Sequence, residues 1–410
     1  KWFKIDFFKL IFILLLQIEN TNYNMNNFVE RDLLNHLKKY LEIFPAVAVL
    51  GPRQCGKSTL IKSLGTHFEG IIYLDLQSAS DLNKLVEPEL FFESNRDKII
   101  CLDEIQLVPQ LFSVLRSVID GNRVNGKFIL LGSASQELIQ QTSESLAGRI
   151  GLLHLSPFLI NELNYLENFT LQKFWFRGGF PISYLAENDE NSSIWIENYI
   201  RTYIERDIPQ LGFHIPALQL RRLLTMCAHN QGQILNLSKL GESLGLTHPT
   251  IKRYIDLLEQ TFIVRTLPPF EINIKKRLVK SPKVFIRDSG ILHQLLAITD
   301  FNSLLGNPIF GSSWECVLIE NIIVNMPSWD YFFYRTATGD EIDLVLSKGN
   351  QCIAIECKAS DAPKVTKGFY RSLEVIKPNK TFIIAPTNDT YQIAENVTVI
   401  GLDNFLKLEL

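Results

Sequence analysis

Nine consecutive residues, GPRQCGKST at 51–59, constrain the fold of this chain more than any other stretch. They follow the apolar run AVAVL and precede LIKSLG, which has the pattern of a helix. The spacing fits G-x-x-x-x-G-K-[ST], the P-loop, in which backbone N–H groups surround phosphates, the lysine reaches the terminal phosphates and the hydroxyl binds Mg²⁺. The flanking strand and helix favour this interpretation over an empty glycine-rich turn, because the helix directs its positive end at the anion. The predicted ATP-binding residues are Gly51, Pro52, Arg53, Gln54, Cys55, Gly56, Lys57, Ser58 and Thr59, with Ser58 as a Mg²⁺ ligand.

Four later apolar runs alternate with helical patterns. They are IIYLDL at 71–76, IICLDE at 99–104, FILLGS at 128–133 and GLLHLS at 151–156. Strands that are apolar throughout are typical of a parallel sheet with both faces covered by helices. The sequence therefore predicts an α/β fold with the parallel sheet of an AAA-like P-loop NTPase.

Polar residues follow these strands where a nucleotide would need them. In IICLDE, four apolar residues precede Asp103 and Glu104, which is the pattern of a Walker B strand. Asp103 is predicted to orient the Mg²⁺ shell and Glu104 to polarise the attacking water, with a capping Asp-Glu pair as the alternative. Ser133 ends the next strand, either as a sensor of the γ-phosphate or as a turn residue. Arg149 precedes the fifth strand as a phosphate sensor, an arginine finger across a subunit interface, or a solvated surface residue.

Charge and cysteine content limit the other functions. The chain has 41 Lys and Arg residues against 44 Asp and Glu residues, so any contact with nucleic acid needs a local basic patch. Its six cysteines show no CxxC pair and no zinc spacing, which indicates reduced thiols in a cytoplasmic protein and oxygen ligands for any metal.

The start of the chain is unusual, since it begins with Lys1 and its first methionine is Met25. The apolar run LIFILLLQI at 10–18 is too short to span a bilayer, and no small-residue cleavage site follows it. We expect residues 1–24 to come from a mis-set start, and we expect no membrane association.

From about residue 158 helical patterns replace the strands. Residues 237–270 read as a helix, a tight turn at Gly245, a second helix capped by Thr247 with Pro249 in its first turn, and a strand. This order predicts a winged helix-turn-helix over 231–290, preceded by a helical segment at 161–230. No chemistry follows from RGGFP at 177–181.

Basic residues of this region give two candidate contacts with DNA. Lys252 and Arg253 lie on the second helix, but nearby acidic residues offset them, so DNA reading and a purely structural role remain open. The segment INIKKRLVKSPK is more basic, and it either contacts phosphates or forms a solvated hairpin. Its basic residues are Lys275, Lys276, Arg277, Lys280 and Lys283.

The stretch GDEIDLVLSKGNQCIAIECKAS at 339–360 reads as a β-hairpin with a Gly-Asn turn. In this register Lys348 faces Gln351 and Asp343 lies opposite Glu356. Opposed carboxylates repel, which makes sense if a cation lies between them. Lys358 projects on the same side as Glu356. Two carboxylates and a lysine predict a site for Mg²⁺-assisted phosphodiester hydrolysis.

The C-terminal motif resembles the PD-(D/E)XK nuclease fold, with Asp343 followed by ECK at 356–358. The resemblance implies that Glu315, in GSSWECVLIEN, is the acidic residue of the first helix and a further metal ligand beside Asp343 and Glu356. Ile342 departs from the family pattern, which has proline at that position.

Over residues 25–410 the chain resembles prokaryotic AAA-type ATPases that carry a winged helix and a nuclease-like C-terminal domain of unknown function. The matching stretches are GPRQCGKSTL, CLDEIQ, GSASQELIQQTSESLAGR, RGGFP, YIRTYIERDI, SPKVFIRDSG, GDEIDLVL and AIECK. The resemblance implies an ATPase core at 25–160 and a nuclease-like α/β domain at 300–410.

The resulting hypothesis is an ATPase that uses ATP and Mg²⁺ and is coupled to a metal-dependent, DNA-acting domain. Its predicted catalytic residues are Glu104, Asp343, Glu356 and Lys358. DNA and further copies of the chain are the expected partners. The alternative is a signalling or scaffold ATPase whose C-terminal domain binds nucleic acid or protein without cleaving it.

Overall fold

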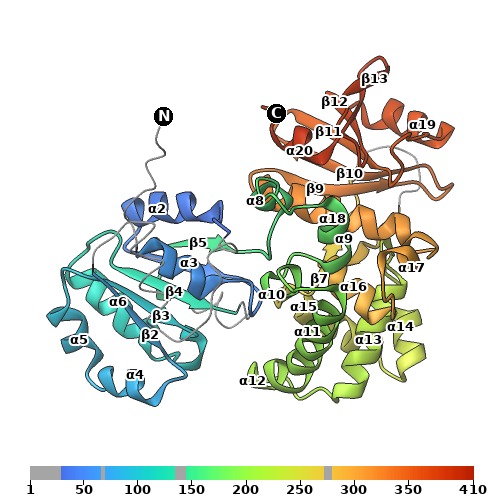
Figure 1. The fold of residues 1–410 in the computed structure, drawn as a ribbon. Coiled ribbons are helices and arrows are strands. Elements are labelled where there is room, and N and C mark those ends of the chain that lie inside the picture. Colours follow the sequence, from blue (N-terminus) through green and yellow to red (C-terminus); the bar gives the residue numbers. More distant parts are fainter. Residues whose placement is uncertain (1–28, 66–69, 134–144, 272–278) are drawn as a thin grey trace. The chain divides into compact units, whose positions relative to one another are not determined.

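The computed structural model describes residues 29–65, 70–133, 145–271 and 279–410 (Figure 1). The chain divides between Phe158 and Leu159 into two compact units. This division lies close to the predicted end of the ATPase core, whereas the finer domain boundaries stay predictions. Residues 1–24, for which a mis-set start is expected, lie outside the described residues. Among the described residues, no helix combines the length and apolar character that crossing a membrane requires.

The N-terminal unit is built on a parallel sheet, as the sequence predicted. In the described residues its strand order is β2-β3-β4-β1-β5. Val47 and Val49 of β1 pack in a core with residues of α2 and α3, while Phe128 of β4 contacts Phe92 of α5. Both faces of the sheet are therefore covered, which explains why the central strands are apolar throughout.

The elements of this unit, apart from a short 3-10 helix at Ile105–Leu107, are α2 (Leu33–Ile43), β1 (Ala46–Leu50), α3 (Lys57–Leu64), β2 (Ile71–Asp75), α4 (Ala79–Lys84), α5 (Pro88–Ser94), β3 (Ile99–Asp103), α6 (Leu111–Gly121), β4 (Phe128–Gly132) and β5 (Ile150–His154).

The strand direction decides which polar residues meet. Leu50, the last residue of β1, pairs with Gly132 of β4, and β3 ends beside them at Asp103. Because parallel strands end at the same edge, the P-loop, the end of β3 and Ser133 share that edge. Arg149 lies at the other end of β5, where its carbonyl accepts the Ala46 N–H at 3.1 Å.

The C-terminal unit contains two sheets in the described residues. One has the order β6-β8-β7 and the other the order β13-β14-β12-β11-β10-β9. Its helices are α8 (Ile160–Leu163), α9 (Leu171–Arg177), α10 (Pro181–Tyr184), α11 (Asp189–Thr202), a π-helix at Tyr203–Asp207, α12 (Ile208–Gln210), α13 (Ala217–His229), α14 (Leu237–Leu244), α15 (His248–Gln260), α16 (Ser289–Leu295), α17 (Phe301–Leu305), α18 (Phe310–Asn325), α19 (Lys367–Ile376) and α20 (Leu402–Leu406). Its strands are β6 (Gln233–Ile234), β7 (Val264–Leu267), β8 (Lys283–Ile286), β9 (Asp330–Arg335), β10 (Glu341–Lys348), β11 (Gln351–Cys357), β12 (Lys380–Ile384), β13 (Tyr391–Ala394) and β14 (Val397–Ile400).

The predicted helix-turn-helix is present as α14 and α15. Gly245 ends α14 in the left-handed region with φ 65°, which glycine adopts without a steric cost. The Thr247 side chain caps α15 by accepting the N–H of Thr250 at 3.4 Å. On α15 Lys252 pairs with Asp256 at 2.8 Å, which offsets its charge. The winged-helix assignment itself stays a prediction.

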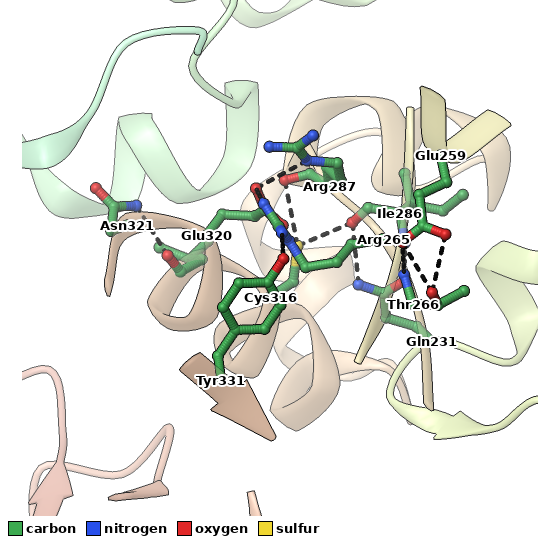
Figure 2. A network of polar contacts seen from close by, with 11 residues as sticks. Gln231, Glu259, Arg265, Thr266, Ile286, Arg287, Cys316, Glu320, Asn321 and Tyr331 are labelled. Atoms are coloured by element: carbon green, nitrogen blue, oxygen red, sulfur yellow. Dashed lines mark hydrogen bonds and ion pairs between the residues drawn. The ribbon is translucent and has the colours of Figure 1, made fainter. Parts of the chain in front are cut away.

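Buried charges join the small sheet to α18. Glu320 of α18 accepts hydrogen bonds from Arg265 of β7 and, at 2.9 Å, from Arg287, which follows β8. Figure 2 shows both guanidinium groups directed at this carboxylate, with the Tyr331 hydroxyl beside Arg265. Because unpaired buried charges are strongly destabilising, these contacts hold β7 and β8 against α18.

The chain after β7 also runs along the edge of the large sheet. The Phe333 N–H donates to the Pro268 carbonyl at 2.9 Å, and the Phe270 N–H donates to the Phe333 carbonyl at 2.6 Å. These bonds satisfy part of the outer edge of β9, which would otherwise present unpaired backbone groups. The small sheet and the large sheet are therefore tied by backbone as well as by side chains.

The RGGFP segment has a structural explanation that its composition did not reveal. Gly178 has φ 75° and ψ −173°, a backbone conformation that is essentially restricted to glycine. A Cβ atom there would lie 2.2 Å from Asp288 Oδ1, and the next residue, Gly179, donates its N–H to Asp288 Oδ2 at 2.8 Å. Asp288 also caps α16 by accepting the Ile291 N–H at 3.0 Å. The two glycines thus seat the buried carboxylate that begins α16.

We predict that Gly178→Ala destabilises the C-terminal unit by about 3 kcal/mol or more, because it combines backbone strain with a clash against Asp288. Gly212→Ala is the matched control, since Gly212 has φ 78° but open space around its Cβ position. The control should lose only the stability that the backbone strain costs, about 1–2 kcal/mol. Urea unfolding of both variants measures the difference, and equal losses would contradict the predicted clash.

Candidate functional site

The P-loop links the end of β1 to the start of α3 through a tightly packed turn. Gly51 has no room for a side chain, because a Cβ atom there would lie 2.2 Å from the Leu155 carbonyl oxygen. Gly56 has φ 101° and immediately precedes α3, so it supplies the left-handed conformation that turns the chain into the helix. Burial raises the pKa of the Cys55 thiol, which therefore stays protonated.

Arg31 supports the P-loop through a hydrogen bond to its backbone, and the sequence did not predict this contact. Its guanidinium is buried and donates from Nη1 to the Cys55 carbonyl at 2.9 Å. Its Nη2 donates to the Ser156 carbonyl at 2.7 Å, beyond the end of β5. No sequence motif identifies this arginine, because one of its partners, Ser156, lies more than a hundred residues away in the sequence.

Lys57 contacts the P-loop backbone, and Ser58 contacts Asp103 at the end of β3. The Lys57 ammonium donates to the carbonyls of Gly51 and Pro52, at 3.0 Å each. The Ser58 hydroxyl donates to Asp103 Oδ2 at 3.0 Å. Tyr73 of β2 also donates its hydroxyl to this oxygen, and burial together with Asp103 raises the pKa of Tyr73. The group expected to contact phosphate is thus bonded to backbone carbonyls, and the two groups expected to hold Mg²⁺ are bonded to each other.

Gln106 connects the predicted general base to the predicted sensor. Glu104 lies in the left-handed region with φ 55°, directly after β3. The Gln106 side-chain amide donates to the Glu104 carboxylate and, at 3.2 Å, to the Ser133 hydroxyl. A glutamine two residues after the Walker B glutamate was visible in CLDEIQ, but spacing alone did not assign it a contact.

Arg149 does not lie with these residues. It pairs with Asp120 at 2.6 Å, at the end of β5 that is remote from the P-loop. It precedes β5 by one residue, and the whole strand separates it from the loop edge. A phosphate sensor within the same chain is therefore inconsistent with this position, because a five-residue strand spans about 16 Å. A role across a subunit interface stays a prediction.

A second group of predicted residues meets in the C-terminal unit. The hairpin of β10 and β11 has the predicted register, with Lys348 opposite Gln351 and Leu344 opposite Ile355. Asp343 Oδ2 accepts the Cys357 N–H at 2.9 Å, next to Glu356. Lys358 donates to Glu356 Oε1 at 2.7 Å. The structure therefore brings the two carboxylates and the lysine together.

Lys283 completes this carboxylate cluster from outside the hairpin. Its ammonium lies 2.9 Å from Glu315 Oε1, 2.6 Å from Glu341 Oε1 and 3.8 Å from Asp343 Oδ1. Burial lowers the pKa of Lys283, but these carboxylates raise it by more, so the ammonium stays charged. Lys283 is thus a cation supplied by the protein beside Asp343, whereas Glu356 pairs with Lys358.

The remaining polar atoms of the cluster test whether a divalent ion fits. Burial and the Asp343 carboxylate raise the pKa of Glu356 to about 8. Its Oε2 atom is buried and has no hydrogen-bond partner among the described residues, and hard oxygen donors of this kind suit Mg²⁺. Among the described residues, however, no three acidic, Cys or His side chains are already arranged to hold a metal ion. The donor type therefore suits the ion, but the present arrangement does not, because Lys283 lies among three of the carboxylates.

Two features of the cluster were not found from sequence. Glu341 was passed over because it precedes the Asp343 motif position, and Lys283 was assigned only to a basic segment. Lys275, Lys276 and Arg277 of that segment lie outside the described residues, and Lys280 is exposed.

Family models match three consecutive parts of the chain. A model described as an AAA domain matches residues 44–164. Models described as domains of unknown function, DUF8612 and DUF4143, match residues 168–302 and 310–405.

Curated relatives span most of the chain. The uncharacterized protein Rv2008c of Mycobacterium tuberculosis is 35% identical over 376 residues, which are 92% of this chain and 84% of the relative. An uncharacterized protein of Haemophilus influenzae is 26% identical over 275 residues, which are 59% of this chain and 67% of that protein.

Solved structures show a more distant likeness. The Walker-type ATPase PABY2304 of Pyrococcus abyssi has a TM-score of 0.47 and 16% identity, over 66% of this chain and 96% of that one. RuvB of Thermotoga maritima has a TM-score of 0.31 and 17% identity, over 59% of this chain and 91% of that one.

We predict that Gln106→Ala slows ATP hydrolysis about tenfold with little change in ATP affinity, because it removes the hydrogen bonds that orient Glu104 and Ser133. Steady-state kinetics and nucleotide titration measure the two effects. Gln110→Ala, on the exposed start of α6, is the control. A loss of ATP affinity with an unchanged turnover number would show that Gln106 acts on binding instead.

Proposed function

The chain belongs to the family of the mycobacterial protein Rv2008c, and we propose that its AAA-type P-loop ATPase is coupled to a metal-dependent, DNA-acting nuclease-like domain. The observation that carries the second part is the meeting of Asp343, Glu356 and Lys358 at one end of a hairpin. The match of residues 44–164 to the AAA domain family supports the ATPase part of the proposal.

In the proposed ATPase reaction, four residues of the N-terminal unit have distinct roles. The Lys57 ammonium exchanges its two carbonyl bonds for the terminal phosphates of ATP. Ser58 and Asp103, which already contact each other at 3.0 Å, would hold Mg²⁺. Glu104 would orient and deprotonate the attacking water.

In the proposed nuclease reaction, Asp343, Glu356 and Glu315 would hold the divalent ion. When bound, such an ion lowers the pKa of water and stabilises charge on a phosphodiester. Lys358 lies beside Glu356, where an ammonium can stabilise the negative charge that develops on the phosphate oxygens. We further propose that the basic residues at 275–277 contact DNA. We also propose a homo-oligomer in which Arg149 lies at the subunit interface.

For the ATPase, Lys57→Ala should abolish ATP binding, whereas Glu104→Gln should keep binding and slow hydrolysis at least about a hundredfold. The lysine contacts phosphate in the bound state, while the glutamate acts on water. Fluorescent-nucleotide titration and phosphate release measure the two steps. Equal loss of binding in both variants would contradict these roles.

For the nuclease, the full chain should cut at least one of linear, nicked or single-stranded DNA when Mg²⁺ and ATP are present. Asp343→Asn should abolish cleavage by removing a ligand of the ion, and Lys358→Ala should abolish it by removing the ammonium. Lys364→Ala, an exposed lysine of the following segment, is the control and should cut normally. Absence of cleavage on every substrate would overturn the nuclease proposal.

A further inference from the structure

We propose that Lys283 holds the place of the divalent cation in the carboxylate cluster, so that the cluster binds a metal ion only when this ammonium withdraws. The inference rests on the proposed function of the C-terminal unit and adds a residue that controls when its site is loaded. The cluster here means Glu315, Glu341, Asp343 and Glu356 together with Lys283.

The first step is the position of the ammonium. Lys283 begins β8 and is 1% exposed, which is rare for a lysine unless carboxylates surround it. Its Nζ atom contacts Glu315 of α18 at 2.9 Å and Glu341 of β10 at 2.6 Å. Asp343 is 3.8 Å away on the same side. The ammonium therefore occupies the space that the predicted metal ligands Glu315 and Asp343 share.

The second step is the number of carboxylates that share one ammonium. Glu315, Glu341 and Asp343 all lie within 3.8 Å of the Lys283 Nζ atom, which offers them a single positive charge. A divalent ion in its place would offer two positive charges to the same carboxylates. The buried Oε2 atom of Glu356, which has no hydrogen-bond partner among the described residues, is a further oxygen donor of the cluster. The shared charge and this oxygen both favour replacement of the ammonium.

The third step is mutual exclusion. An ammonium and a divalent ion sharing the same carboxylate oxygens repel strongly in a buried site, where solvent does not screen them. The Lys283 side chain is a flexible four-carbon stem, so its ammonium can leave without unfolding β8. Binding of the ion and seating of Lys283 are therefore competing states of one cluster.

A purely structural ion pair is the competing explanation, and it predicts a different response to metal. If Lys283 only stabilises the fold, removing its charge leaves carboxylates that no ion can satisfy. If it replaces a metal ion, removing its charge opens a site that Mn²⁺ can fill. The two explanations differ in metal affinity, which is measured without DNA and without catalysis.

The test compares Mn²⁺ binding to the nucleotide-free full chain by electron paramagnetic resonance in the wild type and in Lys283→Met. We expect the variant to bind Mn²⁺ at least about fivefold more tightly, because one competing cation is gone. The double variant Lys283→Met with Asp343→Asn should lose this gain. Lys348→Met removes a positive charge from the same hairpin away from the cluster, and its Mn²⁺ affinity should match the wild type.

A folded Lys283→Met chain that binds Mn²⁺ no more tightly than the wild type overturns the inference. If this variant is unfolded without metal, Lys283→Gln and thermal melting with and without Mn²⁺ decide the question. Recovery of the folded state with Mn²⁺ supports the inference, and failure of both variants to fold with the ion overturns it.

The proposed nuclease function fails separately from this inference. Tighter Mn²⁺ binding without cleavage of any DNA would overturn only the nuclease function. Cleavage by the wild type, with unchanged Mn²⁺ affinity in Lys283→Met, would overturn only the role of Lys283.

Discussion

The pairing of buried charges across α18 is the constraint on which the C-terminal unit depends. Two carboxylates project from this helix. Glu315 pairs with Lys283, and Glu320 pairs with Arg265 and Arg287. Separating β7 and β8 from α18 would leave these ions buried without partners, or would require them all to be hydrated at once. The helix-turn-helix region and the large sheet therefore form one compact unit in which residues 300–410 share their charges with the strands before them.

In the N-terminal unit the direction of the strands has the corresponding role. Because β1, β3 and β4 are parallel, their ends bring Lys57, Asp103 and Ser133 to one edge. Tyr73 then donates a hydrogen bond to Asp103, Gln106 donates one to Ser133, and Arg31 donates one to the P-loop backbone. Lys57, Ser58 and Asp103 are hydrogen-bonded to protein groups, so a nucleotide bound there would exchange these bonds for its own.

Local patterns predicted much of this arrangement, since a P-loop, a Walker B strand and a two-residue hairpin turn are each encoded within a few residues. The register of Lys348 with Gln351 followed from the turn alone. Arg31 and Lys283 could not be predicted, because their contacts depend on tertiary packing with partners that lie 24 and 125 residues from Arg31 and 32 residues from Lys283. No prediction followed from RGGFP, and only the structure identifies Asp288 as the group that approaches its glycines.

Both candidate sites are occupied by the protein's own groups, and they differ in what a ligand must displace. At the P-loop, a phosphate would replace two hydrogen bonds from the Lys57 ammonium to neutral carbonyls, so no opposite charge is left behind. At the carboxylate cluster, a metal ion would replace the close ion pairs of Lys283 with oppositely charged carboxylates, which are buried. A ligand must offset the contacts that it breaks, so the cost of opening is larger at the cluster. The proposed nucleotide site is therefore the one that opens at lower cost, and the proposed metal site requires a state in which β8 or the Lys283 side chain has moved.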